Sequence, residues 1–169
     1  MSRRCSVKVR VLKSDPVYNS VVVSKFINYI MRNGKKSVAE GIFYKALQKI
    51  KVDLGFRNDK DVLDVFNLAL EHVAPKVEVR SRRVGGATYQ IPTTISDNRS
   101  IAIGIRWIID CAWERKGLCM SDKLASELIE ASDKNSSIGK SVGAGLAVKK
   151  REDMHKMAEA NRAFSHYRW

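Results

Sequence analysis

The sequence predicts a mainly α-helical domain of about six helices, with a two-stranded β-hairpin arm that protrudes between the third and fourth helices. Apolar residues recur at intervals of three and four over most of the chain, as they do on one face of an α-helix. Residues 76–95 differ, because two short extended runs there flank a Gly-Gly pair. A length of 169 residues, 44% of them hydrophobic, suits one domain with one core, spanning 1–169.

The first two helices are predicted on either side of a basic loop at residues 32–36. Gly34 in this loop is a typical helix stop, since glycine readily adopts the left-handed conformation that follows many helices. The stripes expected to face the core are Val22, Phe26 and Ile30 in the first helix and Val38, Ile42, Ala46 and Ile50 in the second.

Three further helices are predicted before residue 132. Asn58 is expected to cap the third and Pro75 to end it, the fourth is expected after Arg99-Ser100, and Ser121 is expected to cap the fifth. Their apolar stripes are Val62, Val65, Phe66, Ala69 and Val73, then Ala102, Ile105, Ile108, Ile109 and Ala112, then Leu124, Leu128 and Ile129.

The two ends of the chain differ from this helical middle. Residues 1–18 are a basic extension without a helical apolar stripe, and a Gly/Ser-rich loop at 132–147 precedes a C-terminal helix and tail at 148–169. The stripe of that last helix is Met154, Met157, Ala158, Asn161 and Phe164.

The Gly-Gly pair predicts the geometry of the hairpin. Gly85 and Gly86 can both take positive φ, as a type I′ turn requires. A two-residue turn sets Arg82 opposite Tyr89, while Arg83, one residue on, points to the other face. A ribbon with bases on both faces has no core of its own, so we expect an arm that meets a polyanion. A surface hairpin with merely solvated arginines is the alternative.

The charge balance indicates the same kind of partner. The chain has 31 Lys+Arg against 18 Asp+Glu and a formal net charge of +13, which favours nucleic acid or an anionic membrane. Membrane insertion is not expected, because no stretch approaches the roughly 20 apolar residues that cross a bilayer. Residues 1–13 carry bases without acids, so they suit a segment that orders on phosphates, or a solvated tail. The cations at 149–151 stand where a helix start prefers acids, which favours a binding role.

Enzyme chemistry finds no support in the residue pattern. The three cysteines form no Cys-x-x-Cys pair, so neither a disulfide framework nor a metal site is expected. Gly139-Lys140-Ser141 lacks the first glycine of a phosphate-binding loop. We therefore expect no catalytic residue, metal or cofactor. An architectural DNA-binding protein remains the alternative function, although Val84 and Ala87, which flank the turn, are small for a wedge between base pairs.

Two long motifs carry a family resemblance. Residues 79–92 read Val-Arg-Ser-Arg-Arg-Val-Gly-Gly-Ala-Thr-Tyr-Gln-Ile-Pro, and residues 149–164 read Lys-Lys-Arg-Glu-Asp-Met-His-Lys-Met-Ala-Glu-Ala-Asn-Arg-Ala-Phe. With Arg106-Trp107 and the closing residues 166–169, they make the chain resemble the small-subunit ribosomal protein seven family, bacterial or organellar type, over nearly its whole length. The resemblance implies a helical domain with a protruding hairpin, located in the bacterial cytoplasm or in an organelle matrix or stroma. It also implies binding to the 3′ major domain of small-subunit ribosomal RNA and nucleation of head assembly.

The resemblance also implies site residues and partners. The residues expected to face ribosomal RNA are Arg3, Arg4, Lys8, Arg10, Lys35, Lys36, Lys76, Arg80, Arg82, Arg83, Lys149, Lys150 and Arg151. Those expected near exit-site transfer RNA and the messenger RNA exit path are Arg82, Arg83, Tyr89, Arg162, Tyr167, Arg168 and Trp169. The implied protein neighbours are the ninth, eleventh, thirteenth and nineteenth small-subunit proteins.

Overall fold

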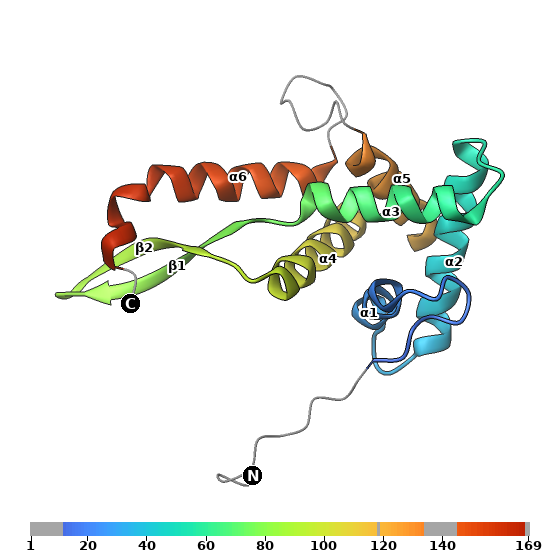
Figure 1. The fold of residues 1–169 in the computed structure, drawn as a ribbon, viewed down its shortest axis with the longest axis horizontal. Coiled ribbons are helices and arrows are strands. Elements are labelled where there is room, and N and C mark those ends of the chain that lie inside the picture. Colours follow the sequence, from blue (N-terminus) through green and yellow to red (C-terminus); the bar gives the residue numbers. More distant parts are fainter. Residues whose placement is uncertain (1–11, 118, 134–144, 168–169) are drawn as a thin grey trace, which may run out of the picture.

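The computed structural model describes residues 12–117, 119–133 and 145–167, and it confirms the predicted fold class. A two-stranded antiparallel hairpin lies between the third and fourth helices of a mainly helical chain (Figure 1). The elements in chain order are α1 (Val21–Ile30), α2 (Lys36–Asp53), α3 (Asp59–Val73), β1 (Val77–Val84), β2 (Ala87–Thr94), α4 (Asp97–Glu114), α5 (Met120–Ser132), α6 (Leu146–Ala160) and the 3₁₀ helix η2 (Arg162–Tyr167).

The core is built around three phenylalanines from the first three helices. Phe26 of α1, Phe43 of α2 and Phe66 of α3 are fully buried, and their ring centroids lie 5.2 to 5.5 Å apart. The ring of Phe66 meets each of the other two edge to face, an arrangement that the aromatic quadrupole favours. Branched side chains of α4 and α5, such as Ile108 and Leu128, extend the same core.

The predicted buried stripe of α2 is wrong by one position at its start. Val38 is 56% exposed, whereas Ala39, Phe43, Ala46 and Leu47 are buried. Both sets have helical spacing, so periodicity alone does not separate them. The structure places the large ring of Phe43 inward, and this turns Val38 to the surface.

The predicted starts of α4 and α5 also move. α4 begins at Asp97 with Ser96 in the N-cap position, so Arg99 lies inside the helix. α5 begins at Met120, with Cys119 rather than Ser121 in the N-cap position. Neither cap position makes a side-chain hydrogen bond, the interaction on which the predicted cap at Ser121 depended.

α6 begins at Leu146, two residues before its predicted start, and a buried carboxylate holds this end. The backbone N–H of Ala147 donates to Oε1 of Glu127, which is fully buried, over 2.8 Å. The other carboxylate oxygen accepts from Nε of Arg115 at 2.6 Å. A Cβ added to Gly145 would lie 3.2 Å from both the Ala131 backbone nitrogen and the Glu127 carboxylate, so a side chain here would force these neighbours to shift.

Beyond this anchor, α6 leaves the helical body and runs beside the hairpin (Figure 1). Its buried residues are accordingly few: Ala147 and Val148 at the anchored end and Ala158 further along. The helix ends at Ala160, so Phe164 lies in η2 and not on the predicted stripe of the last helix. Because η2 turns back onto β2, the hairpin is accompanied by the C-terminal segment and does not stand alone.

Candidate nucleic-acid interface

The hairpin arm has the turn and register predicted from the sequence. Gly85 and Gly86 have φ of +57° and +93°, values that a β-branched residue adopts only with strain. The register pairs Arg82 with Tyr89, so Arg82 and its neighbour Arg83 point to opposite faces. Both arginines are exposed, and neither forms an ion pair with any residue that the structure describes.

One face of the arm packs against the C-terminal segment. The ring of Tyr89 lies 5.1 Å from that of Phe164 and 5.8 Å from that of Tyr167, with the second pair stacked. Ile91, two residues from Tyr89 and therefore on the same face, is 1% exposed. The expectation that the ribbon buries nothing of its own is therefore wrong. Tyr89 and Tyr167 stay partly exposed, so each ring retains some surface for a stacking partner.

The root of the arm contains a buried carboxylate between two arginines. Glu78 of β1 accepts hydrogen bonds from Nε of Arg80 in the same strand and, at 2.9 Å, from Nε of Arg99 in α4. Burial raises the pKa of a carboxyl group, but the hydrogen bonds from Arg99 and Arg80 outweigh it, so the pKa of Glu78 is lowered. Glu78 is therefore ionised at neutral pH, and two cations and one anion leave a net positive group.

Other contacts attach the same root to the helical body. The hydroxyl of Ser100 in α4 donates to the carbonyl of Pro75 at 2.7 Å. On the side of α6, the backbone N–H of Lys76 donates to Nε2 of His155 at 3.3 Å. Burial, followed by the charges of Arg151 and Lys76, lowers the pKa of His155, so its ring is neutral and can accept this bond.

The predicted basic residues at the start of α6 have three different surroundings. Lys149 is exposed. Lys150 lies 3.3 Å from a carboxylate oxygen of Glu114 in α4. Arg151 is half-buried and donates through Nη1 to the carbonyl of His72 in α3. Lys149 is therefore the freest of the three to meet an external phosphate, while the other two also join α6 to the helical body.

A second basic site lies in the loop between α1 and α2. Asn33 and Gly34 have positive φ, and the tight turn that they form exposes Lys35 and Lys36. Lys36 lies 3.8 Å from a carboxylate oxygen of Glu40, an exposed i,i+4 pair that adds little stability.

Arg32, the first residue of the predicted basic loop, was not among the predicted site residues. Arg32 lies over the exposed ring of Trp113 in α4, 4.0 Å from the ring centroid, as in a cation–π interaction. Arg99 was missed for a similar reason, because its partner Glu78 is distant in the sequence. Pairing between remote segments produces both contacts, and no local spacing indicates it.

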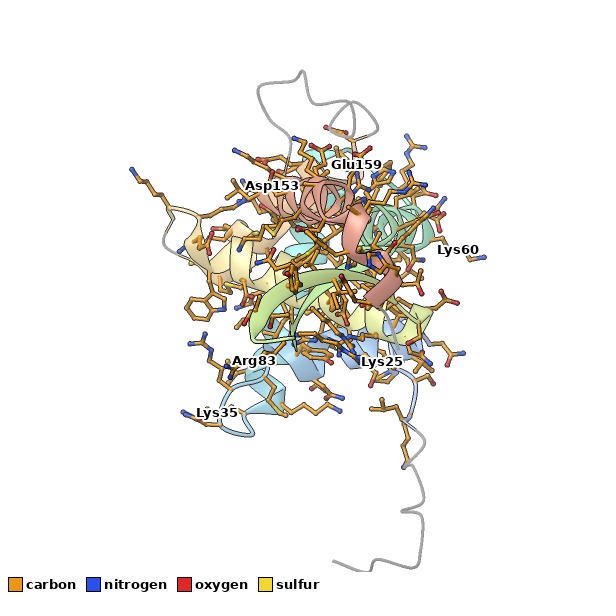
Figure 2. The ribbon with its side chains drawn as sticks, turned by 90° about the vertical axis from the view of Figure 1, so that its left-hand side faces the viewer. Lys25, Lys35, Lys60, Arg83, Asp153 and Glu159 are labelled. Carbon is orange, nitrogen blue, oxygen red and sulfur yellow. The ribbon has the colours of Figure 1, made fainter. Side chains whose placement is uncertain are left out.

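Cations of the arm, α1 and the α1–α2 loop lie on a different side of the molecule from two carboxylates of α6. Figure 2 views the structure towards the tip of the arm, and Arg83, Lys35 and Lys25 lie on the side away from α6. Asp153 and Glu159 of α6 lie on the opposite side. Arg83 of the arm, Lys25 of α1 and Lys35 of the α1–α2 loop thus share one side, where they can act on one extended polyanion.

The remaining predicted site residues have limited or no structural description. Lys76 is exposed at the root of the arm, and Arg162 is exposed in η2. The N-terminal bases and the last two residues lie outside the described residues; they are Arg3, Arg4, Lys8, Arg10, Arg168 and Trp169.

Neither a metal centre nor a membrane span is found in the described part of the chain. No group of three or more His, Cys, Asp or Glu side chains there could hold a metal ion. Within the same residues, no helix combines the length and the apolar character needed to cross a bilayer.

Comparisons with known proteins place this surface in a family context. The family model described as "Ribosomal protein S7p/S5e" matches residues 2–162. Proteins named "Small ribosomal subunit protein uS7" from Francisella tularensis subsp. holarctica and from Afipia carboxidovorans are each 52% identical to this chain over 169 residues. In both cases the alignment covers 100% of this chain and 100% of the relative.

Proposed function

The chain belongs to the ribosomal protein S7p/S5e family and is a protein of the small ribosomal subunit, and from this premise we propose that it binds the 3′ major domain of small-subunit ribosomal RNA. By binding there it nucleates assembly of the subunit head. Its role is that of a structural and RNA-binding component, without catalysis.

The observation that carries this proposal is the set of exposed cations on the arm and on the α1–α2 loop that form no ion pair with any described residue. Arg82 and Arg83 lie on an arm that extends beyond the helical body, and Lys35 lies on the loop between α1 and α2. Their separation suits an extended phosphate backbone better than a small ligand, because each group can meet a different phosphate. We include Lys76, Arg80, Lys149 and the N-terminal bases in this interface.

The distal end of the arm supports a second part of the proposal. Tyr89 and Tyr167 are partly exposed, η2 also carries the exposed cation Arg162, and aromatic faces accept any nucleobase. We assign this end, with Arg82 and Arg83, to the neighbourhood of exit-site transfer RNA and the messenger RNA exit path. The proposed protein neighbours are the ninth, eleventh, thirteenth and nineteenth small-subunit proteins. The bacterial relatives favour a bacterial ribosome, and hence the cytoplasm, over an organelle.

Competitive reconstitution of small subunits tests the proposal. The double variant Arg82→Ala/Arg83→Ala removes two charges from the arm without touching its turn. A matched double variant, Lys45→Ala/Lys60→Ala, removes two exposed charges from α2 and α3. We expect the arm variant to compete poorly with the unaltered protein for incorporation, or to give subunits that hold exit-site transfer RNA weakly, while the control behaves as the unaltered protein does. Equal competition together with normal transfer RNA binding would refute a functional role for the arm.

Direct binding separates this function from the alternative of an architectural DNA-binding protein. The unaltered protein is titrated with a ribosomal RNA fragment of the 3′ major domain, an unrelated RNA of equal length and duplex DNA. Binding should be tightest to the ribosomal fragment, and its affinity should fall by about three to five orders of magnitude between 50 and 200 mM salt if roughly six to ten phosphates are neutralised. Preference for duplex DNA, or a flat salt titration, contradicts the proposal.

A further inference from the structure

The root of the arm contains a carboxylate where an RNA-binding surface gains nothing from negative charge. Glu78 is 9% exposed and stands between Arg80 and Arg99. A carboxylate so close to a bound polyanion opposes binding by Coulomb repulsion. Its burial also costs free energy unless hydrogen bonds compensate for the lost hydration. This placement has a physical rationale if the carboxylate fixes the orientation of the two guanidinium groups.

The contacts show how it organises them. One carboxylate oxygen meets Nε and Nη2 of Arg80, and the other meets Nε and Nη2 of Arg99. Each guanidinium therefore turns the same edge towards Glu78. Among the described residues, Nη1 of each arginine makes no hydrogen bond, and the two side chains remain 53% and 49% exposed.

Two guanidinium groups held on one carboxylate lie close enough to act on one anion. Each free Nη1 carries two N–H donors, and guanidinium donors match the oxygen geometry of a phosphate. Holding both side chains in place before binding removes much of the conformational entropy that a flexible arginine loses on contact with RNA. The hydrogen bond from Ser100 to Pro75 ties α4 to the segment that leads into β1, and that from Thr93 of β2 to the carbonyl of Glu78 holds the two strands together there.

Building on the proposed function, we propose that Glu78 is a positioning residue, which holds Arg80 and Arg99 as a preformed pair that binds one backbone phosphate of the RNA. Arg99 thereby joins the interface, although no sequence motif indicated it. Glu78 also couples the direction of the arm to α4, because Arg80 belongs to β1 and Arg99 to α4.

The decisive variant is Glu78→Gln, which removes one negative charge and retains the shape of the side chain. If charge alone matters, binding to the ribosomal RNA fragment becomes tighter. If Glu78 positions the arginines, binding weakens by roughly two- to tenfold, as expected when about one side chain loses its preorganisation. The matched control is Asp97→Asn, which makes the same change of charge two residues from Arg99, on an exposed residue that forms no ion pair within the described part of the chain. It should leave binding unchanged or slightly tighter.

A double-mutant cycle separates positioning from a general effect on the fold. In an Arg80→Ala/Arg99→Ala background, Glu78→Gln should no longer weaken RNA binding. A second variant, Arg99→Lys, keeps the charge but loses the planar group that meets both Glu78 and phosphate; it should also weaken binding while leaving the thermal melt nearly unchanged.

Each outcome bears on one proposal or the other. Unchanged or tighter binding by Glu78→Gln overturns the positioning role, as does a loss of binding that persists in the background lacking both arginines. If the unaltered protein binds the ribosomal fragment no better than the unrelated RNA, the proposed function itself is overturned, and so is the role assigned to Glu78.

Discussion

Replacing Glu127 with Gln should destabilise the protein strongly, although the change adds or removes no bulk. Glu127 is fully buried, and its two oxygens accept from Nε of Arg115 at 2.6 Å and from the backbone N–H of Ala147 at 2.8 Å. Glutamine can still accept from Ala147 through its amide oxygen. Its amide nitrogen, however, then faces the donors of Arg115, so an attractive contact becomes a contact between two donors.

The size of this loss of stability depends on the partners that Arg115 keeps after the substitution. Removing one partner of a buried ion pair costs about 3–5 kcal/mol, because the other charge is left uncompensated. Arg115 keeps its second partner, Glu130, to which Nη1 donates at 2.8 Å. The loss of unfolding free energy should therefore lie below the upper part of that range, at about 2–4 kcal/mol. For a chain of this size, each kcal/mol corresponds to about 2–4 °C in Tm, so Tm should fall by about 5–15 °C.

Thermal melting and urea unfolding measure this change, and Glu130→Gln is the control. Glu130 binds the same arginine, but its side chain is 35% exposed and solvent compensates for its loss. The control should therefore cost about 1 kcal/mol or less. Amide hydrogen exchange should show the largest loss of protection in the first turn of α6. The reasoning is refuted if Glu127→Gln melts within about 1 °C of the unaltered protein, or if the two variants are equally destabilised.

Three further predictions concern the arm, its root and the N-terminal segment. Tyr89→Ala removes the ring that packs on Phe164, so we expect faster amide exchange in β2 with little change in global Tm; unchanged exchange would show that the aromatic contact does not hold the arm. The pKa of His155 is lower in the folded state than its ordinary value of 6.5, so the unfolded state binds the proton more readily, and stability present above about pH 6.5 should be lost as the pH falls through the folded-state pKa. His155→Gln keeps an acceptor for Lys76 and should abolish that part of the pH dependence; an unaltered pH profile of urea midpoints would contradict it. Deleting residues 1–13 should weaken RNA binding and leave the melt nearly unchanged, because that segment has no helical apolar stripe, and a collapsed melting transition would contradict this expectation.

The sequence by itself determined the features that depend on local chemistry. Consecutive glycines at 85 and 86 accept positive φ at low cost, so the turn, the pairing of Arg82 with Tyr89 and the opposite faces of Arg82 and Arg83 were predicted correctly. Helical periodicity identified the helices and most of their core residues, because burial of an apolar face is the main driving force for their formation. The net charge predicted a polyanionic partner, because it is a sum over the sequence and does not depend on the fold.

Only the tertiary structure decided which residues of a helix face the core when the sequence allowed more than one apolar stripe. Val38 and Ala39 both fit a helical stripe, and the packing of Phe43 against Phe26 and Phe66 put Ala39 inside. The starts of α4, α5 and α6 moved by a few residues.

The candidate interface shows most clearly the difference between what the sequence predicts and what tertiary contacts decide. The sequence indicated that Lys150 and Arg151 are available to RNA. In the structure, Lys150 pairs with Glu114 and Arg151 donates to the carbonyl of His72. Arg99 gained significance only because β1 places Glu78 beside it. Charge is a property of each residue, whereas the orientation of a charged group and its partners arise from contacts between segments far apart in the chain, and these exist only once the core has packed.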